Sequence, residues 1–292
     1  MKTNEFIEYL KANGYTNRTI TIMKRTIRFY EQWLEREQLE AEQATYRDIL
    51  SYIKYQQNQG VTQRTIQHYL VSIRHYYDYL IEARKVVQNP VTGIKVQGVK
   101  RKILYHIFQP HQLNAIYNSH KDETLKGRRD KVILGLLVYQ GLRAEDLGRM
   151  ETNHIKLREG QIEVPGGTRR NGRTMKLESH QIMEMYDYML QVRPEIVRKS
   201  GAETDKLFVS PEGGTQISNF ISRLMARLKK QHPQLVNAKQ IRASVITKWL
   251  RMYNLREVQY LAGHRYISST ESFLENEMEG LKEEVQQFHP LG

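Results

Sequence analysis

Two arginines and a histidine have side chains that could bind a phosphate group, and a phenylalanine follows them in the sequence. Arg143 follows Gly141-Leu142, Arg242 ends Lys239-Gln240-Ile241-Arg242, and His264 ends Leu261-Ala262-Gly263-His264. Phe273 stands nine residues after the histidine. Breaking a phosphodiester without water requires a nucleophile, positive charge beside the non-bridging oxygens and a proton for the leaving oxygen. Arginine suits the second requirement, because its planar guanidinium binds phosphate through two hydrogen bonds and stays charged.

The order of these residues resembles the active-site layout of the tyrosine recombinases, the phage-type integrases. The resemblance covers nearly the whole chain, since a helical bundle, a linker and a mixed catalytic domain follow one another in the family's order. It implies that Arg143 and Arg242 hold the scissile phosphate, that Asp146 supports this region, and that His264 donates a hydrogen bond to the phosphate. The implied activity is site-specific DNA recombination or integration by phosphoryl transfer through a 3′-phosphotyrosine intermediate, with no cofactor.

Position 273 departs from the family, whose nucleophile is a tyrosine nine residues after the histidine. Phenylalanine keeps the ring and its packing but lacks the attacking hydroxyl, so we expect this chain to be inactive in cleavage. An experimenter would choose this Tyr-to-Phe replacement to trap an uncleaved DNA complex, and a natural, inactive relative is the alternative. Tyr266, two residues after His264, is a weaker candidate for a substitute nucleophile than for a packing or DNA-contact residue.

The general acid is a second departure. The family's general-acid lysine lies in the turn between two strands, and here the turn 168–172 contains Arg169 and Arg170 instead. Arginine is too basic to be an efficient proton donor near neutral pH. The alternatives are Lys176, in the following strand, and Lys239, at the histidine position of the family's His-x-x-Arg box. The sequence does not decide between a displaced acid and weak proton transfer.

The charge of the chain favours a nucleic-acid partner. Its 292 residues include 45 Lys and Arg against 32 Asp and Glu, a net charge of +13. The surplus is five up to residue 100 (15 against 10) and eight from residue 101 onward (30 against 22). A basic balance in both halves suits double-stranded DNA lying across two domains.

Other features exclude several classes of protein. The chain has no cysteine, which excludes disulfides and thiolate metal sites, and its ten histidines are scattered without ligand spacing. No apolar run approaches the ~20 residues of a membrane helix, and the N-terminus lacks the pattern of a signal peptide. We therefore expect a cytoplasmic protein with no metal site and no membrane association.

Residues 1–88 are predicted to form an N-terminal helical DNA-binding domain, which the resemblance identifies as a SAM-like, core-binding bundle. A short first helix, a second over 19–34 and a third over 46–55 follow from apolar spacing. Thr62 is the expected N-cap of a fourth helix, and most of the tyrosines are expected to pack in the core. The basic residues here and in the linker that we expect to contact DNA are Arg18, Lys24, Arg25, Arg64, Arg74, Lys95, Lys100, Arg101 and Lys102.

Asn89-Pro90 ends the bundle, and residues 89–103 are predicted to be a basic interdomain linker. Residues 104–292 are predicted to form a mixed α+β catalytic domain. Its expected elements are a core helix over 132–139, strands at 161–164 and 173–177 with a third at 207–209, and helices over 182–190, 217–228, 244–252 and 255–261.

The end of the chain is predicted to be an amphipathic helix with Met278, Leu281, Val285 and Phe288 on one face. Its simplest role is to dock on its own domain. The resemblance instead implies that this C-terminal helix packs into a neighbouring protomer, coupling a homo-tetramer on two duplexes.

Two other functions remain open beside a recombinase. A non-catalytic, sequence-specific DNA-binding protein that retained the fold would account for Phe273 and for the missing hairpin lysine. It would have little need of Arg143, Arg242 and His264. A type IB topoisomerase shares the chemistry, but the N-terminal bundle and linker resemble the integrases more closely.

Overall fold

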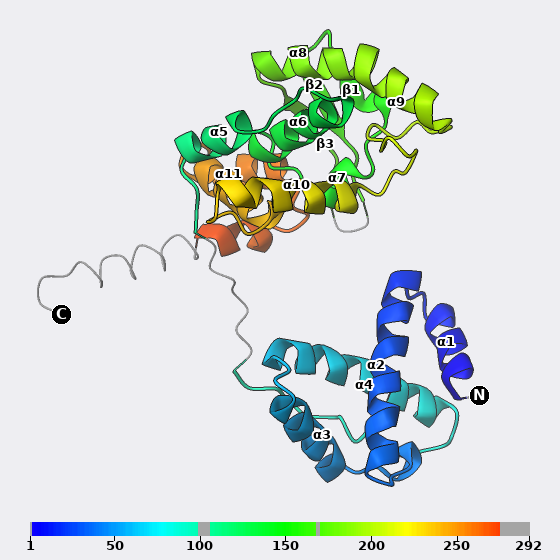
Figure 1. Cartoon of the computed structure of the whole chain (residues 1–292). Coiled ribbons are helices and arrows are strands. Elements are labelled where there is room, and N and C mark those ends of the chain that lie inside the picture. The colour runs from blue at the N-terminus through cyan, green and yellow to red at the C-terminus, as the bar shows by residue number, and fades with distance from the viewer. Residues whose placement is uncertain (1, 99–105, 168–169, 275–292) are drawn as a thin grey trace, which may run out of the picture. The chain divides into compact units, whose positions relative to one another are not determined.

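The computed structural model describes residues 2–98, 106–167 and 170–274. The chain divides into two compact units, Met1–Ile103 and Leu104–Gly292, each with its own hydrophobic core (Figure 1). Helices dominate both units, and the small sheet lies in the second, which confirms the predicted fold class. Within the described ranges no helix is both long and apolar enough to cross a membrane.

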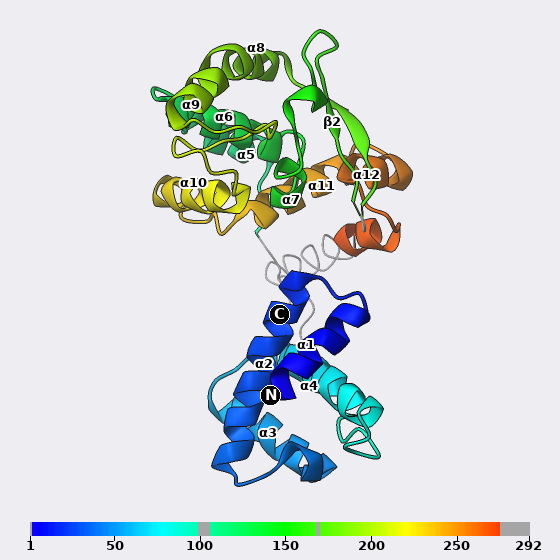
Figure 2. The ribbon, with the colours of Figure 1, turned by 90° about the vertical axis from the view of Figure 1, so that its right-hand side faces the viewer.

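Four α-helices make up the described part of the first unit: α1 (Lys2–Ala12), α2 (Asn17–Arg36), α3 (Tyr46–Asn58) and α4 (Gln63–Glu82) (Figures 1 and 2). A single 3-10 turn, Ala41–Gln43, joins α2 to α3. Thr16 and Thr62 cap α2 and α4 in the same way, because each hydroxyl accepts a hydrogen bond from the backbone N–H three residues later. The predicted helices and the Thr62 N-cap are confirmed.

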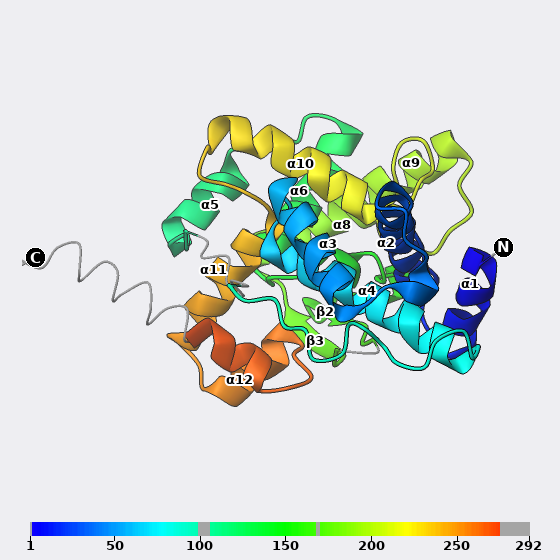
Figure 3. The same ribbon diagram turned by 90° about the horizontal axis from the view of Figure 1, so that it is seen from below.

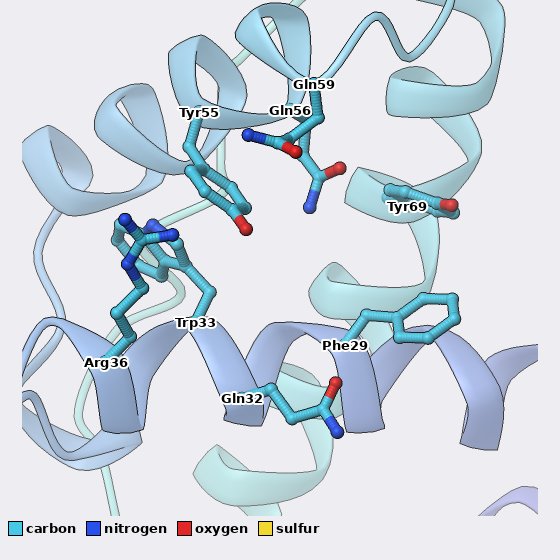
Figure 4. A pocket seen from close by; sticks show the side chains of 8 residues that line it. All are labelled: Phe29, Gln32, Trp33, Arg36, Tyr55, Gln56, Gln59 and Tyr69. Carbon is cyan, nitrogen blue, oxygen red and sulfur yellow. The ribbon is translucent and has the colours of Figure 1, made fainter.

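Tyrosines form much of the core of the first unit, as predicted. Tyr30, Tyr52, Tyr76 and Tyr77 are fully buried. The Tyr30 and Tyr77 hydroxyls are 2.8 Å apart, and Tyr77 donates to the carbonyl of Ala41 at 2.9 Å. A hollow of about 260 Å³ opens between α2, α3 and α4, with the aromatic and amide side chains of Figure 4 on its walls. The four buried tyrosine rings therefore pack the core of the first unit.

The segment that follows α4 packs on the first unit as far as the structure describes it. The Asn89 side-chain amide donates to the carbonyl of Arg74 at 3.0 Å and to Asp78 at 2.7 Å. Val91 and Ile94 are buried in the same core as the tyrosines. The first part of the predicted linker, 89–98, is thus anchored by two apolar side chains, whereas Lys100, Arg101 and Lys102 lie outside the described residues.

The second unit is built around α6 (Leu125–Val138), whose residues from Arg129 onward are all buried. Against it lie α5, α8, α10 and α11, together with a π-helical turn, Tyr188–Val192 (Figures 1 and 3). The other helices of the described part are α5 (Pro110–Asn118), α7 (Ala144–Leu147), α8 (Ser179–Asp187), α9 (Arg193–Ser200), α10 (Ile217–Gln231), α11 (Ala238–Leu250), α12 (Leu255–Ala262) and the 3-10 turn Thr152–His154. The expected C-terminal helix of Met278, Leu281, Val285 and Phe288 lies outside the described residues.

An antiparallel sheet in the order β1-β2-β3 is formed by β1 (Ile155–Lys156), β2 (Gln161–Val164) and β3 (Arg173–Lys176). Val164 pairs with Arg173 beside the turn, and Gln161 pairs with Lys176 at the far end. The prediction of a third strand at 207–209 is wrong, because that segment belongs to no strand. It is a buried apolar run beside an isolated bridge between Lys206 and Glu151. Leu207 donates its backbone N–H to the carbonyl of Met150 at 3.0 Å, and its own carbonyl accepts from Tyr188 at 2.7 Å.

Candidate active site

The turn after α6 places Arg143 at the edge of the core. Gly141 has φ +54°, and a Cβ there would lie 3.1 Å from the Val245 side chain, so glycine allows both the turn and the close approach of α11. Leu142 is buried beneath the turn. The half-buried Arg143 side chain donates no hydrogen bond to any residue that the structure describes, which leaves its guanidinium available to a ligand.

A buried carboxylate holds this region together. Asp146 accepts hydrogen bonds from Arg170 at 2.8 Å, from Arg173 at 3.2 Å and from the backbone N–H of Arg143 at 3.2 Å. Burial alone would raise the pKa of Asp146, but Arg173 and Arg170 outweigh burial and hold the pKa below its ordinary value. Asp146 is therefore ionised and ties the β2–β3 hairpin to the start of α7.

Arg242 joins two loops that are far apart in the sequence. From α11 its guanidinium donates to the carbonyl of Gly141 at 2.5 Å and to the carbonyl of Ala262 at 2.7 Å. Burial and the neighbouring Arg143 and Arg173 guanidinium groups lower the pKa of Arg242 well below its ordinary value. Arginine nevertheless stays protonated in proteins, so Arg242 carries a buried positive charge that Arg143 and Arg173 repel.

His264 follows the end of α12, where Gly263 closes the helix in the left-handed conformation with φ +62°. A Cβ on Gly263 would lie 2.3 Å from Nη1 of Arg173, so only glycine leaves room for that arginine. The His264 ring has Nε2 3.1 Å from Nη2 of Arg242 and Nδ1 2.9 Å from Oγ1 of Thr270. Burial first, and then Arg242 and Arg143, lower the pKa of His264 to about 3. The ring is therefore neutral at pH 7.

Phe273 lies directly against this histidine. The two rings stack with centroids 5.9 Å apart and planes 18° from parallel, and Phe273 is packed at the margin of the core. Tyr266, by contrast, is 63% exposed, with the Arg265 guanidinium 5.8 Å from its ring centroid. Phe273, and not Tyr266, thus shares its immediate surroundings with His264.

The cluster carries more positive charge than its own acids neutralise. Arg143, Arg170, Arg173 and Arg242 surround one buried carboxylate, and an exposed second one, Glu145, lies 3.4 Å from Arg170. Burial and the other arginines lower the pKa of Arg143, which shows the same crowding of positive charge. An anion at this position would relieve the repulsion, and a phosphate group offers the bidentate geometry that guanidinium groups prefer.

Not every candidate residue reaches the cluster. Lys239 is exposed on the first turn of α11, and Lys176 is exposed on the face of β3 opposite Arg173. No hydrogen bond within the described ranges joins either lysine side chain to Asp146 or His264, the two groups of the cluster that could accept one. Arg170 contacts Asp146, and Arg169 lies outside the described residues.

Two residues of the site were missed by sequence reasoning. Arg173 is buried in β3, and its Nε has no hydrogen-bond partner among the described residues. The alternation of β3, in which Arg173 and Met175 face inward, was a signal that the arginine is not a surface residue. Thr270 gave no comparable signal, because its contact with His264 depends on the turn between them.

The basic candidates of the first unit lie mainly on its surface. Arg18, Lys24 and Arg25 are exposed on α2, and the Arg25 guanidinium lies 5.4 Å from the ring centroid of Phe29. Arg64 on α4 and Lys95 are exposed as well, whereas Arg74 is half-buried and its carbonyl accepts from Asn89. Their positions are compatible with phosphate contact.

The chain belongs to the phage integrase family. The profile of the phage integrase family matches residues 106–279, and that of the phage integrase N-terminal SAM-like domain matches residues 3–84. Tyrosine recombinase XerC of Anoxybacillus flavithermus (strain DSM 21510 / WK1) is 25% identical over 281 residues, covering 92% of this chain and 91% of the relative. Tyrosine recombinase XerC of Bacillus subtilis (strain 168) is 24% identical over 290 residues, covering 98% of this chain and 95% of the relative.

Solved structures show the same fold. The Tn1549 transposon integrase in complex with a circular intermediate DNA has a TM-score of 0.68 at 14% identity, covering 94% of each chain. A lambda integrase tetramer bound to a Holliday junction has a TM-score of 0.67 at 13% identity, covering 93% of this chain and 76% of that one. The arrangement of elements around the cluster is therefore that of the integrases.

The neutral state of His264 predicts a loss of stability at mildly acidic pH. The pKa is 6.5 for an ordinary histidine and about 3 in the folded site. As pH falls from 6.5 toward 3, the unfolded chain binds a proton that the folded site does not, so the free energy of unfolding decreases. At pH 5 this residue should account for a decrease of about 2 kcal/mol relative to pH 8.

Denaturant unfolding of the full chain at pH 5 and at pH 8 measures this difference. His264→Gln should reduce the difference between the two pH values, whereas His111→Gln, at an exposed position of α5, should leave it unchanged. An equal pH dependence in all three proteins would show that His264 is charged or solvated in the folded chain.

Proposed function

We propose that this chain is a site-specific DNA recombinase or integrase that holds one phosphodiester of double-stranded DNA in the arginine cluster. The observation that carries the proposal is the surplus of positive charge, in which Arg143, Arg170, Arg173 and Arg242 face a single buried carboxylate. Such charge, fixed before the substrate arrives, stabilises the additional negative charge of a phosphoryl-transfer transition state.

In the proposed reaction, a tyrosine hydroxyl at position 273 would attack the phosphorus, giving a 3′-phosphotyrosine and releasing a 5′-hydroxyl. Arg143 and Arg242 would bind the non-bridging oxygens, and His264 would donate a hydrogen bond to one of them. Phe273 has no oxygen to attack with, so we infer that this chain binds DNA without cleaving it. We interpret the phenylalanine as an engineered Tyr-to-Phe trap, and a naturally silent gene is the alternative, which the natural codon 273 decides.

The proposed working form is a homo-tetramer on two duplexes, coupled by exchange of the C-terminal helices, and the expected compartment is the cytoplasm. The similar lambda integrase was solved as a tetramer on a Holliday junction, which supports this assembly by analogy. Both units are proposed to contact the duplex, since both have a surplus of basic residues.

A non-catalytic DNA-binding protein is the second candidate. Phe273 favours it, as does the exposure of Lys176 and Lys239, since neither side chain has a hydrogen bond to Asp146 or His264 among the described residues. This candidate and the recombinase predict the same binding and differ in what a tyrosine at position 273 would do.

Selection of a binding site from random duplexes, followed by a salt titration, tests the part that both candidates share. For six to ten phosphate contacts, the affinity should fall by about 10³ to 10⁵ between 50 and 200 mM salt. Fluorescence anisotropy with the selected duplex measures the slope, and an unselected duplex of equal length serves as the control. A slope near zero for the selected duplex would refute an extended phosphate-binding surface.

A further inference from the structure

Thr270 is a fully buried hydroxyl that contacts the imidazole of His264. It lies six residues after His264 and three before Phe273, in the helical segment 268–274. Its backbone N–H donates to the carbonyl of Ile267 at 2.7 Å, which fixes the turn, and its Oγ1 lies 2.9 Å from Nδ1 of His264. The contact therefore joins the histidine to the segment that carries position 273.

The partners of the ring determine where its proton lies. The guanidinium of Arg242 has only donors, so the 3.1 Å contact requires Nε2 of His264 to accept. A neutral ring has one N–H, which must then be at Nδ1 and must donate to Oγ1 of Thr270. In the free protein, the nitrogen that faces the arginine cluster thus presents a lone pair.

A phosphate oxygen cannot pair with that lone pair. If phosphate replaces Nε2 as the acceptor of the Arg242 hydrogen bond, a favourable contact with His264 requires a proton on Nε2. Nδ1 then releases one proton to solvent and Nε2 takes one up from solvent, so the ring remains neutral and the number of its protons does not change. In this second form Nδ1 is an acceptor and needs a donor.

A hydroxyl serves both forms of the ring, because it can accept from Nδ1–H and can also donate to a bare Nδ1. A carboxylate or a carbonyl at this position would only accept, and a backbone N–H would only donate. Arg242 contacts Nε2 and not Nδ1, and the charges of Arg143, Arg173 and Asp146 act on the ring without a hydrogen bond to it among the described residues. The hydroxyl of Thr270 can therefore stay hydrogen-bonded to Nδ1 in either neutral tautomer of His264.

We propose that Thr270 is a positioning residue for His264, whose hydroxyl fixes the ring and allows Nε2 to change from acceptor to donor when a phosphodiester enters. The proposal rests on the proposed function, because it assumes that phosphate binds at the arginine cluster. In this proposal Thr270 acts through the histidine, which its hydroxyl contacts at Nδ1.

Nuclear magnetic resonance of the full chain labelled with ¹⁵N at histidine tests the proposal without requiring cleavage. His264→Gln identifies the resonances of the ring. We expect Nδ1 to be protonated in the free protein and Nε2 to be protonated with the selected duplex bound, in the present chain with Phe273 and in its Thr270→Ser variant. In Thr270→Val, which has the same shape but no hydroxyl, we expect the change on DNA binding to be lost. An unchanged tautomer in the present chain on DNA, or a full change in Thr270→Val, would overturn the proposal.

Cleavage by the same variants in a Phe273→Tyr background gives the second readout. Thr270→Val should slow adduct formation by about 10- to 100-fold, by analogy with the loss of a hydrogen-bond partner of a metal-bound histidine, and Thr270→Ser should restore most of the rate. Equal rates for threonine and valine would overturn the proposal. If Phe273→Tyr alone forms no adduct on a bound duplex, the proposed recombinase fails, and the tautomer measurement still decides the role of Thr270. A purely structural role would lower the melting temperature of Thr270→Val and leave its tautomer change intact.

Discussion

Replacing Phe273 with tyrosine is expected to convert a chain that only binds DNA into one that forms a covalent protein–DNA adduct. The ring at position 273 is already packed at the margin of the core and stacked on His264 with centroids 5.9 Å apart. The substitution adds one oxygen to a partly exposed ring that is already in place, so we expect it to require little rearrangement. The nucleophile would then stand beside positive charge fixed by Asp146 and the backbone, an arrangement that favours phosphoryl transfer.

The measurement is a denaturing gel of the full chain with a nicked duplex containing the selected site, followed by peptide mapping of the adduct. We expect no adduct from the present chain, and a 3′-phosphotyrosine with a free 5′-hydroxyl from Phe273→Tyr, without a divalent metal. Tyr266→Phe in the same background is the matched control and should leave the adduct unchanged. An adduct formed by the present chain through Tyr266 would show that the nucleophile is assigned wrongly.

Absence of an adduct from Phe273→Tyr on a bound site would favour the non-catalytic protein. The physical reason would be the lack of a proton donor for the leaving oxygen. The side chains of Lys239 and Lys176 are exposed, and Arg170 is hydrogen-bonded to Asp146. A leaving oxygen without a donor is expelled slowly, even where the phosphate is held well. The same experiment therefore separates the two proposed functions.

Much of the candidate site could be predicted from sequence, because Arg143, Arg242 and His264 are each the last residue of a short motif. Gly141 and Gly263 mark a turn and a helix end that only glycine adopts easily, and each stands within two residues of a candidate side chain. Arg143 and His264 could therefore be proposed from these short motifs, through their resemblance to those of the family. Arg173 could not, because its role depends on a carboxylate 27 residues earlier and on the space beside Gly263.

The elements of the fold that local sequence signals determine were predicted, and those that tertiary contacts determine were not. Among the helices with apolar residues on one face, α2 was predicted with both ends correct to two residues and α4 with the correct N-cap, since periodicity and a threonine cap are local signals. The predicted start of α11 at residue 244 was six residues late, because Asn237 caps a helix whose first turn contains no apolar stripe. The strand predicted at 207–209 failed because an apolar run reports burial, and only tertiary contacts decide whether it pairs.

Removing either Arg143 or Arg242 is expected to abolish most cleavage while leaving most DNA binding. In a Phe273→Tyr background, each alanine variant should lower the rate of adduct formation by about 10² to 10³, as when one fixed donor to a developing charge is lost. Binding should weaken far less, because the other phosphate contacts of both units remain. Rates are measured in single turnover on the nicked duplex and affinities by anisotropy on the intact one.

The two arginines differ in what their removal does to the protein. The Arg143 side chain donates to no described residue, and the backbone N–H that Asp146 accepts from is kept in alanine, so Arg143→Ala should fold normally and report on phosphate alone. Arg242 donates to the carbonyls of Gly141 and Ala262, so Arg242→Ala should also lower the melting temperature. Arg242→Lys is measured beside it, because lysine keeps a positive charge at this position. Arg198→Ala, at an exposed position of α9, is the control and should change neither rate nor affinity measurably. Cleavage at the full rate in Arg143→Ala would remove that arginine from the active site, because no loss of folding could then obscure the result.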